Sequence, residues 1–280
     1  MAKKTESTHL SAKELRQQKT TLCDGLSFAA AEAYKLLRTN LMFSLPDKPC
    51  RIIGVTSSVR GEGKSTTAVN LSYTFAQSGK RVLLIDADMR LPSVSTKLSI
   101  TLKPGLSNLL AGLSEESQCL RVSKYFENWY ILPAGDIPPN PSELLGSERM
   151  HALLDRCTEI FDLIVIDLPP IGVVTDALVI APWTDGLIVT VRQNYTERKA
   201  LNACMYQINK LGAKFLGFVM TDAAVGEGSY KRYGKYGHSY GYGYGYGYDS
   251  TESRRSGKND KAFLDAAAES AAASTGTKTE

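Results

Sequence analysis

The chain contains 280 residues with a mass of 30.5 kDa, a length typical of one or two domains. Hydrophobic residues make up 43% of the sequence and charged residues 22%, which excludes a wholly disordered chain. The formal net charge of +4, from 33 basic and 29 acidic residues, is too small to indicate nucleic-acid binding, and we expect no nucleic-acid partner. The sequence contains no apolar run long enough for a membrane-spanning helix.

The amino-terminal residues and the cysteines indicate a cytoplasmic protein. The start of the chain is polar and lacks the apolar segment of a secretory signal. The five cysteines are widely spaced and include no C-x-x-C pair. We therefore expect neither a disulfide framework nor a zinc site.

Composition divides the chain into three segments. Residues 1–26 are polar and basic, which predicts a flexible arm. Residues 27–228 alternate apolar runs with helical patterns and form the predicted domain. Residues 229–280 form a predicted flexible tail, with a Tyr/Gly repeat followed by a Ser/Lys/Ala-rich end.

The middle segment predicts an α/β fold with a mainly parallel central sheet between two helical layers. Apolar runs rich in β-branched residues, separated by helical patterns, are typical of a parallel sheet that is covered on both faces. Ligands bind such sheets at the carboxyl ends of the strands. Strands are predicted at 51–57, 81–86, 129–133, 163–167, 186–192 and 215–221, and helices at 29–43, 65–78, 106–111, 142–157, 176–181 and 196–211.

A glycine-rich loop follows the first predicted strand and matches the G-x-x-x-x-G-K-[ST] template, with Ser58 in place of the first glycine. Such a loop turns backbone N–H groups toward phosphate oxygens, Lys64 supplies a positive charge to the β- and γ-phosphates, and Ser65 offers a hydroxyl to Mg²⁺. A glycine-rich turn with a chance lysine is the alternative, which the strand–loop–helix order disfavours. The fold is therefore predicted to be of the P-loop NTPase type, and the predicted nucleotide-binding residues are Ser58, Val59, Arg60, Gly61, Glu62, Gly63, Lys64, Ser65 and Thr66.

Two further strands end in carboxylates. Asp86 and Asp88 follow the second strand, where their mutual repulsion is offset if a divalent cation lies nearby; an Asx turn is the alternative. Asp167 ends an apolar strand in the Walker B pattern, which places a carboxylate near Mg²⁺. Asp176 precedes a helical pattern and is expected to be an N-cap rather than a catalyst.

Eight of the fourteen tyrosines lie close together in the tail and are separated mostly by glycine. An adhesive low-complexity segment or a stacking platform for nucleic acid are possible interpretations. In a chain with a P-loop, phosphate-accepting tyrosines are the favoured hypothesis. These residues are Tyr230, Tyr233, Tyr236, Tyr240, Tyr242, Tyr244, Tyr246 and Tyr248.

Together these segments resemble the bacterial protein-tyrosine kinases (BY-kinases) of the CpsD/CapB type, which act in capsular and extracellular polysaccharide synthesis. The resemblance rests on the loop SSVRGEGKST, the segment LLIDADMRLP as Walker A′, FDLIVIDLPP as Walker B, and the tyrosine cluster. It extends to Glu32, Lys35 and Arg38, which match the family's oligomerisation motif with lysine at one arginine position. MinD/ParA-type ATPases are related, but they carry a second lysine where this chain has Val59.

The resemblance implies autophosphorylation of the tail in trans, with ATP and Mg²⁺. Lys64 would neutralise the transferring phosphoryl group, Ser65 and Asp88 would hold Mg²⁺, Asp167 would help through the water shell, and Asp86 would orient or deprotonate the incoming tyrosine. It also implies a ring-shaped homo-oligomer, a separate transmembrane activator at the inner face of the membrane, and a cognate tyrosine phosphatase. A MinD/ParA-like ATPase without kinase activity and a nucleotide-controlled binding module remain alternatives.

Overall fold

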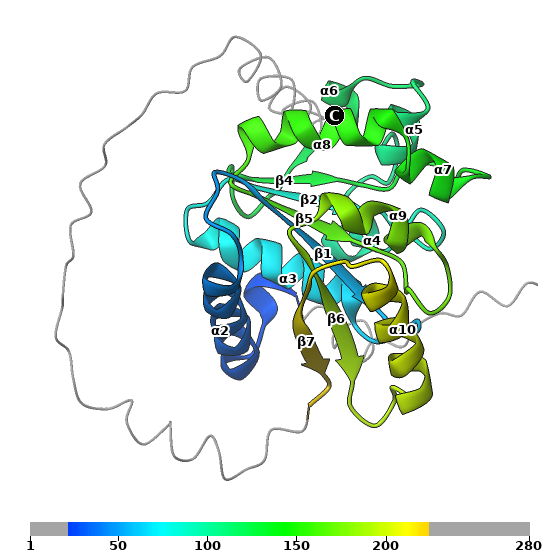
Figure 1. Cartoon of the computed structure of the whole chain (residues 1–280). Helices are drawn as coiled ribbons and strands as arrows, with labels where there is room; N and C mark the ends of the chain where they lie inside the picture. Colours follow the sequence, from blue (N-terminus) through cyan, green and yellow to red (C-terminus); the bar gives the residue numbers. More distant parts are fainter. Residues whose placement is uncertain (1–21, 224–280) are drawn as a thin grey trace, which may run out of the picture.

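A seven-stranded sheet forms the centre of the computed structural model, which describes residues 22–223 (Figure 1). The strand order is β3-β4-β2-β5-β1-β6-β7, and all neighbouring strands are parallel except β3, which runs antiparallel to β4. The mainly parallel α/β sheet predicted from the sequence is therefore confirmed. The strands are β1 (Arg51–Ser57), β2 (Val82–Asp86), β3 (Arg121–Val122), β4 (Trp129–Leu132), β5 (Leu163–Asp167), β6 (Gly186–Arg192) and β7 (Phe215–Thr221).

Helices cover both faces of this sheet, and each face has its own apolar core. The longer helices are α2 (Phe28–Ser44), α3 (Lys64–Gln77), α8 (Glu148–Ile160) and α10 (Arg198–Lys210). Shorter ones are η1 (Cys23–Gly25), α4 (Val94–Leu98), α5 (Leu106–Leu110), α6 (Glu116–Cys119), α7 (Pro141–Leu145), α9 (Asp176–Ile180) and η2 (Ala181–Trp183). Helices α2, α3 and α4 pack on one face, and α5, α8, α9 and α10 contribute to the core on the other.

Alternation along the strands divides the apolar side chains between the two cores. In β1, Ile52 belongs to the core beneath α8, whereas Ile53 and Val55 belong to the core beneath α3. All five residues of β2 and of β5 are buried. Burial on both faces explains why these strands are continuous apolar runs in the sequence.

The predicted elements agree with the structure except at one helix and several short segments. The helix predicted over 142–157 is wrong as a single element, because α7 ends at Leu145 and α8 begins at Glu148. Ser147 lies between them, and its side chain accepts a hydrogen bond from the N–H of Met150, which marks a new helix start. The elements η1, α4, α6 and β3 were not predicted, and they contain at most five residues each.

The amino-terminal end of the described chain packs against the domain. Cys23, within the segment assigned to the arm, is buried, and its N–H donates to the side chain of Asn70 at 2.8 Å. Arg38 ties α2 to α3 by donating to the carbonyl of Thr74 at 2.8 Å. No helix among residues 22–223 is long and apolar enough to cross a membrane.

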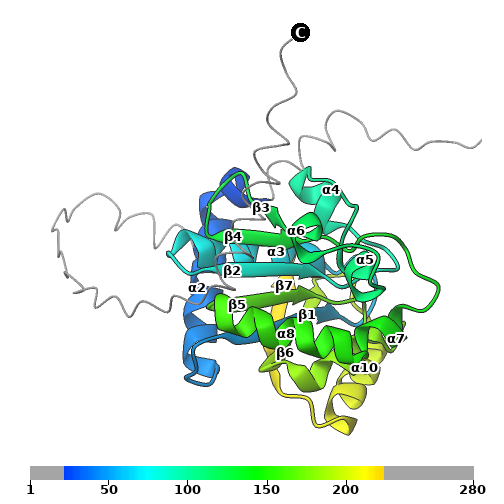
Figure 2. The same ribbon diagram turned by 90° about the horizontal axis from the view of Figure 1, so that it is seen from above.

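The sheet order brings three strand ends together at one edge. β1 lies between β5 and β6, and β2 lies between β4 and β5. In the register of β2 and β5, Asp86 is paired with Asp167. Figure 2, viewed from above, shows β2, β5 and β1 side by side, so the loops that follow them share this carboxyl edge.

Candidate active site

The glycine-rich loop leads directly from β1 into α3. Gly61 and Gly63 have φ values of 82° and 88°, in the left-handed region that glycine adopts without strain. Gly63 occupies the N-cap position of α3, and α3 begins at Lys64. The sequence therefore places a helix N-terminus with free N–H groups beside the lysine, as an anion-binding site requires.

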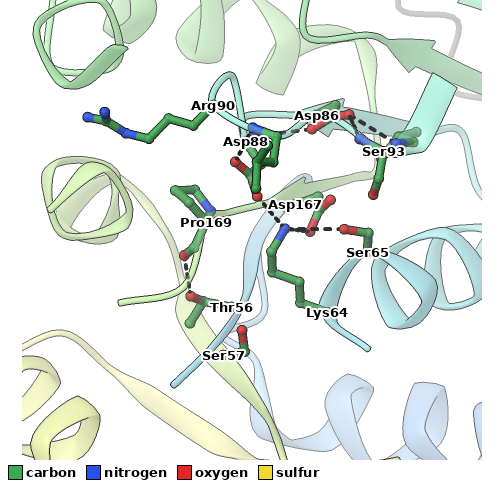
Figure 3. A network of polar contacts seen from close by, with 12 residues as sticks. Thr56, Ser57, Lys64, Ser65, Asp86, Asp88, Arg90, Ser93, Asp167 and Pro169 are labelled. Carbon is green, nitrogen blue, oxygen red and sulfur yellow. Dashed lines mark hydrogen bonds and ion pairs between the residues drawn. The ribbon is translucent and has the colours of Figure 1, made fainter. Parts of the chain in front are cut away.

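The ammonium of Lys64 lies between two carboxylates at the ends of other strands (Figure 3). Its Nζ is 2.7 Å from Asp88 Oδ2 and 3.4 Å from Asp167 Oδ1, and it donates to the hydroxyl of Ser65 at 3.2 Å. Burial alone would lower the pKa of Lys64, but Asp167 and Asp88 outweigh burial, so its pKa is raised. The lysine is therefore a permanent positive charge at this edge of the sheet.

Asp167 is fully buried, and one of its oxygens is unused. Burial raises the pKa of this carboxyl group, and Lys64 and Ser65 counteract the rise. Its Oδ2 atom has no hydrogen-bond partner among the described residues. An unpartnered buried carboxylate oxygen is costly unless a ligand satisfies it.

This donor set fits Mg²⁺. Among the described residues no group of three or more His, Cys, Asp or Glu side chains could hold a metal by itself. Mg²⁺ is usually held by one or two carboxylates, with phosphate oxygens and waters completing its coordination. Asp88, Asp167 and the hydroxyl of Ser65 provide oxygen ligands of that kind beside the loop.

Asp86 holds the segment that follows β2. Its carboxylate accepts hydrogen bonds from the N–H groups of Asp88 at 3.2 Å, Ser93 at 3.2 Å and Val94 at 3.1 Å. In Figure 3 it lies toward Ser93 rather than toward Lys64. Burial, followed by the charge of Asp167, raises the pKa of Asp86 to about 8. Near neutral pH a proton on Asp86 reduces repulsion between the clustered carboxyl groups.

Arg90 and Asp176 form a second ion pair close to the site. The guanidinium donates from Nε at 2.7 Å and from Nη2 at 2.9 Å to the two oxygens of Asp176, and Ser142 donates to the same carboxylate at 2.5 Å. Asp176 was expected to be an N-cap, but it is the first residue of α9 and Thr175 is the N-cap. Its carboxylate instead fixes the segment after Asp88 to α7 and α9.

The predicted loop, Lys64, Ser65, Asp88 and Asp167 come together in one contact network, with Asp86 directly behind it. Glu32, Lys35 and Arg38 lie on α2, away from the strand ends. The tail tyrosines lie outside the described residues. A further lysine, Lys97 of α4, interacts electrostatically with Asp167 and Lys64. Neither Lys97 nor the Arg90–Asp176 pair was singled out from the sequence, because the contacts join elements far apart in the chain.

Strand, glycine-rich loop, helix and carboxylate-bearing strand ends together define a P-loop nucleotide-binding protein. The family model described as "AAA domain" matches residues 50–216. Tyrosine-protein kinase YwqD of Bacillus subtilis is 36% identical over 207 residues, covering 74% of this chain and 86% of that protein. Tyrosine-protein kinase CpsD of Streptococcus agalactiae is 35% identical over 226 residues, covering 80% and 93% respectively. The chain belongs to the family of bacterial tyrosine-protein kinases.

Solved structures agree with this family. The kinase domain of the Escherichia coli tyrosine kinase ETK is 28% identical, with a TM-score of 0.67 over 80% of this chain and 84% of that one. The chimerical protein CapA2B2 has the same TM-score at 29% identity, over 75% of this chain and 98% of that one. MinD of Pyrococcus horikoshii, solved with Mg-ADP, is 27% identical with a TM-score of 0.51, over 61% of this chain and 70% of that one. The TM-scores of the two kinase structures thus exceed that of the septum site-determining protein.

The Arg90–Asp176 pair gives a prediction about stability. Replacement of Arg90 by Ala leaves the buried Asp176 carboxylate without its cation, so we expect the free energy of unfolding at pH 7 to fall by about 2–4 kcal/mol. Arg90→Lys should recover only part of this loss, because lysine cannot make the two-point contact. Urea unfolding is the measurement, and Arg156→Ala, at an exposed ion pair, is the control with an expected change below about 1 kcal/mol.

The same pair predicts a pH dependence. The pKa of Asp176 is lowered in the fold, where the hydrogen bonds from Arg90 and Ser142 outweigh burial. A lowered pKa contributes stability above the unfolded-state pKa, and that contribution disappears as pH falls through the folded-state pKa. The loss in free energy of unfolding caused by Arg90→Ala should therefore become smaller as pH falls. An equal loss in free energy of unfolding at pH 7 and at pH 3.5 would contradict this electrostatic account.

Proposed function

We propose that this protein is a tyrosine autokinase that transfers the γ-phosphoryl group of ATP to the tail tyrosines Tyr230 to Tyr248 of a neighbouring copy. The observation that carries the proposal is the contact of Lys64 with Asp88, Asp167 and Ser65 at the start of α3, in a chain of the tyrosine-kinase family. We further propose that the kinase regulates capsular and extracellular polysaccharide synthesis and export.

Lys64 would act on the transferring phosphoryl group. Its ammonium is neutralised by Asp88 and Asp167. Phosphate oxygens would replace these carboxylates as its partners, while the N–H groups at the start of α3 bind the β-phosphate. In phosphoryl transfer, charge and positioning contribute most of the catalysis.

The carboxylates released from Lys64 would then hold Mg²⁺. Asp88 and the hydroxyl of Ser65 would be direct ligands, and Asp167 would orient metal-bound water through its unpartnered Oδ2. When bound, the metal ion supplies positive charge to the β- and γ-phosphates. ATP and Mg²⁺ are therefore the proposed substrate and cofactor.

Asp86 would orient or deprotonate the attacking tyrosine hydroxyl. Its pKa is raised to about 8, and the positive charge of a bound metal ion nearby would favour the ionised form, which can accept the phenol proton. The residue also accepts three backbone hydrogen bonds, so its replacement must keep an acceptor. Asparagine keeps one acceptor oxygen, for the N–H groups of Ser93 and Val94, and removes the basic group.

We propose that copies of this chain assemble into a ring through the exposed side of α2. Only Leu41 is buried in this 17-residue helix, and Leu36 and Phe43 are 61% and 87% exposed. Lys35 forms an ion pair with Glu32 at 2.8 Å on the same helix. Such an exposed apolar face is typical of an interface. A transmembrane activator, which would bring the kinase to the inner face of the membrane, and a tyrosine phosphatase are further proposed partners.

The kinase proposal predicts labelling of the tail. Incubation of the purified full chain with labelled ATP, Mg²⁺ and an activator fragment should place label on residues 230–248, as mapped by mass spectrometry. Lys64→Met should reduce labelling by at least about a hundredfold, because it removes the charge at the developing phosphoryl group. Lys210→Met, at an exposed position on α10, is the matched control. Release of free phosphate without labelled tyrosine would favour an ATPase instead, and neither product would favour a binding module.

The role of Asp86 has its own test. Asp86→Asn should lower the rate of tail phosphorylation by about a hundredfold and leave the affinity for ATP nearly unchanged. Asp155→Asn, at an exposed carboxylate on α8, controls for loss of charge. Tail phosphorylation at the wild-type rate, with ATP binding intact, would show that Asp86 does not act on the tyrosine.

The proposed interface predicts that Leu36→Asp lowers the mass of the unphosphorylated assembly. A charge in the apolar face of α2 would have to be buried without a partner, which strongly disfavours association. Light scattering of the full chain at one protein concentration measures the mass. Leu113→Asp, at a position that is 76% exposed outside α2, is the control. Equal masses for wild type and Leu36→Asp would place the interface elsewhere.

A further inference from the structure

The outer side of the phosphate loop is held by side chains from two distant segments. Three consecutive loop carbonyls each accept a hydrogen bond. The Tyr195 hydroxyl donates to the carbonyl of Arg60 at 3.0 Å, and Arg192 Nη1 donates to that of Gly61 at 3.2 Å. The Thr221 hydroxyl donates to the carbonyl of Glu62 at 2.9 Å. Arg192 ends β6, Tyr195 follows it, and Thr221 ends β7.

A fourth side chain, that of Thr196, contacts the loop at the buried carboxylate of Glu62. Glu62 is fully buried, and its carboxylate accepts from the N–H groups of Ser58 at 2.7 Å and Val59 at 2.9 Å, and from the Ser58 hydroxyl at 2.8 Å. The hydroxyl of Thr196, beyond Tyr195, donates to the same carboxylate. These bonds explain why a serine stands where the loop template has its first glycine. We name Arg192, Tyr195, Thr196 and Thr221 the outer brace.

Planar trans peptide groups connect this outer side with the inner one. In such a group the carbonyl of one residue and the N–H of the next point in opposite directions. Holding the carbonyls of Arg60, Gly61 and Glu62 outward therefore turns the N–H groups of Gly61, Glu62 and Gly63 inward. Within residues 22–223 these three N–H groups donate to no other group, so they are available to a ligand. A bond accepted by a carbonyl also makes the N–H of the same peptide group a stronger donor.

We propose that the outer brace consists of positioning residues that orient the loop N–H groups toward a polyphosphate. Its ligand class, a nucleoside di- or triphosphate, rests on the proposed function. The brace adds to the rigidity of the loop, so less ordering is needed when the phosphates bind. Thr221 also packs against Gly63, where an added Cβ would lie 3.0 Å from its methyl carbon, so β7 supports the last residue of the loop before α3.

Three variants test the brace with little change in shape. Tyr195→Phe and Thr221→Val each remove one contact, and Thr196→Val removes the contact with Glu62 together with the acceptor of the Arg192 N–H. Isothermal titration of the full chain with ADP and with ATP, each with Mg²⁺, should show dissociation constants raised about threefold to tenfold for each variant, the usual effect of one hydrogen bond. Tyr206→Phe, at a half-exposed tyrosine of α10, and Thr158→Val, whose hydroxyl donates to the carbonyl of Asp155, are the matched controls and should bind as the wild type does.

A second measurement separates positioning from general stability. The melting temperature without nucleotide should stay close to the wild-type value, while the increase caused by nucleotide and Mg²⁺ should shrink. In the phosphorylation assay the KM for ATP should rise with kcat changed less than about twofold, because loop N–H groups bind phosphates alike in the ground and transition states.

If the wild type binds nucleotide and all three variants have unchanged dissociation constants, the proposal for the outer brace is overturned and the kinase proposal is unaffected. Lower melting temperatures without nucleotide, combined with unchanged affinity, would likewise reduce the brace to a structural support and overturn the proposal. A wild type that binds nucleotide but labels no tyrosine would overturn the kinase proposal, while weaker binding by the variants would still support the brace. Failure of the wild type to bind any nucleotide would overturn both.

Discussion

The contact of one buried ammonium with the carboxylates at two strand ends is the constraint on which the site depends. Lys64 lies 2.7 Å from Asp88 and 3.4 Å from Asp167, and Asp86 is held directly behind them. Three carboxyl groups in so small a buried region repel one another strongly unless a cation or a proton is present. The protein provides both, since Lys64 supplies the cation and the raised pKa of Asp86 lets that group retain a proton near neutral pH.

This arrangement suits a metal-bound polyphosphate. Lys64 neutralises Asp88 and Asp167, and these carboxylates are also the groups that would hold a metal ion beside the phosphates. Either cation balances the buried carboxylates through charge-assisted contacts. The unpartnered Oδ2 of Asp167 is the carboxylate oxygen that remains for such a ligand. The Arg90–Asp176 pair fixes the segment that carries Asp88, so this carboxylate is held in position beside Lys64.

The sequence predicted the sheet and the charged side chains that gather at its carboxyl edge, because these depend on local patterns. Continuous apolar runs identified the six longer strands, and the strand–loop–helix order identified Lys64 and Ser65. Position at strand ends was enough to predict that Asp86, Asp88 and Asp167 lie together, since parallel strands end at one edge. The break between α7 and α8 was missed because both helices share one apolar pattern, and Ser147 has no distinctive signal within it. Asp176 was misassigned because its partner Arg90 lies 86 residues away.

The contacts on the outer side of the loop could not be predicted from the sequence, because they join residues that lie far apart in the chain. These contacts bear on why this loop functions with one lysine. MinD/ParA-type loops are expected to carry a second lysine at the position of Val59, which is uncharged here. The phosphate charge must then be balanced by Lys64, by metal, and by N–H dipoles. A dipole contributes only when its direction is fixed, whereas a lysine side chain can move to reach its ligand. A loop that relies more on its peptide groups therefore has more need of residues that hold its carbonyls outward. Arg192, Tyr195 and Thr221 meet that need, and Thr196 holds the carboxylate of Glu62. All four lie more than 120 residues further along the chain than the loop.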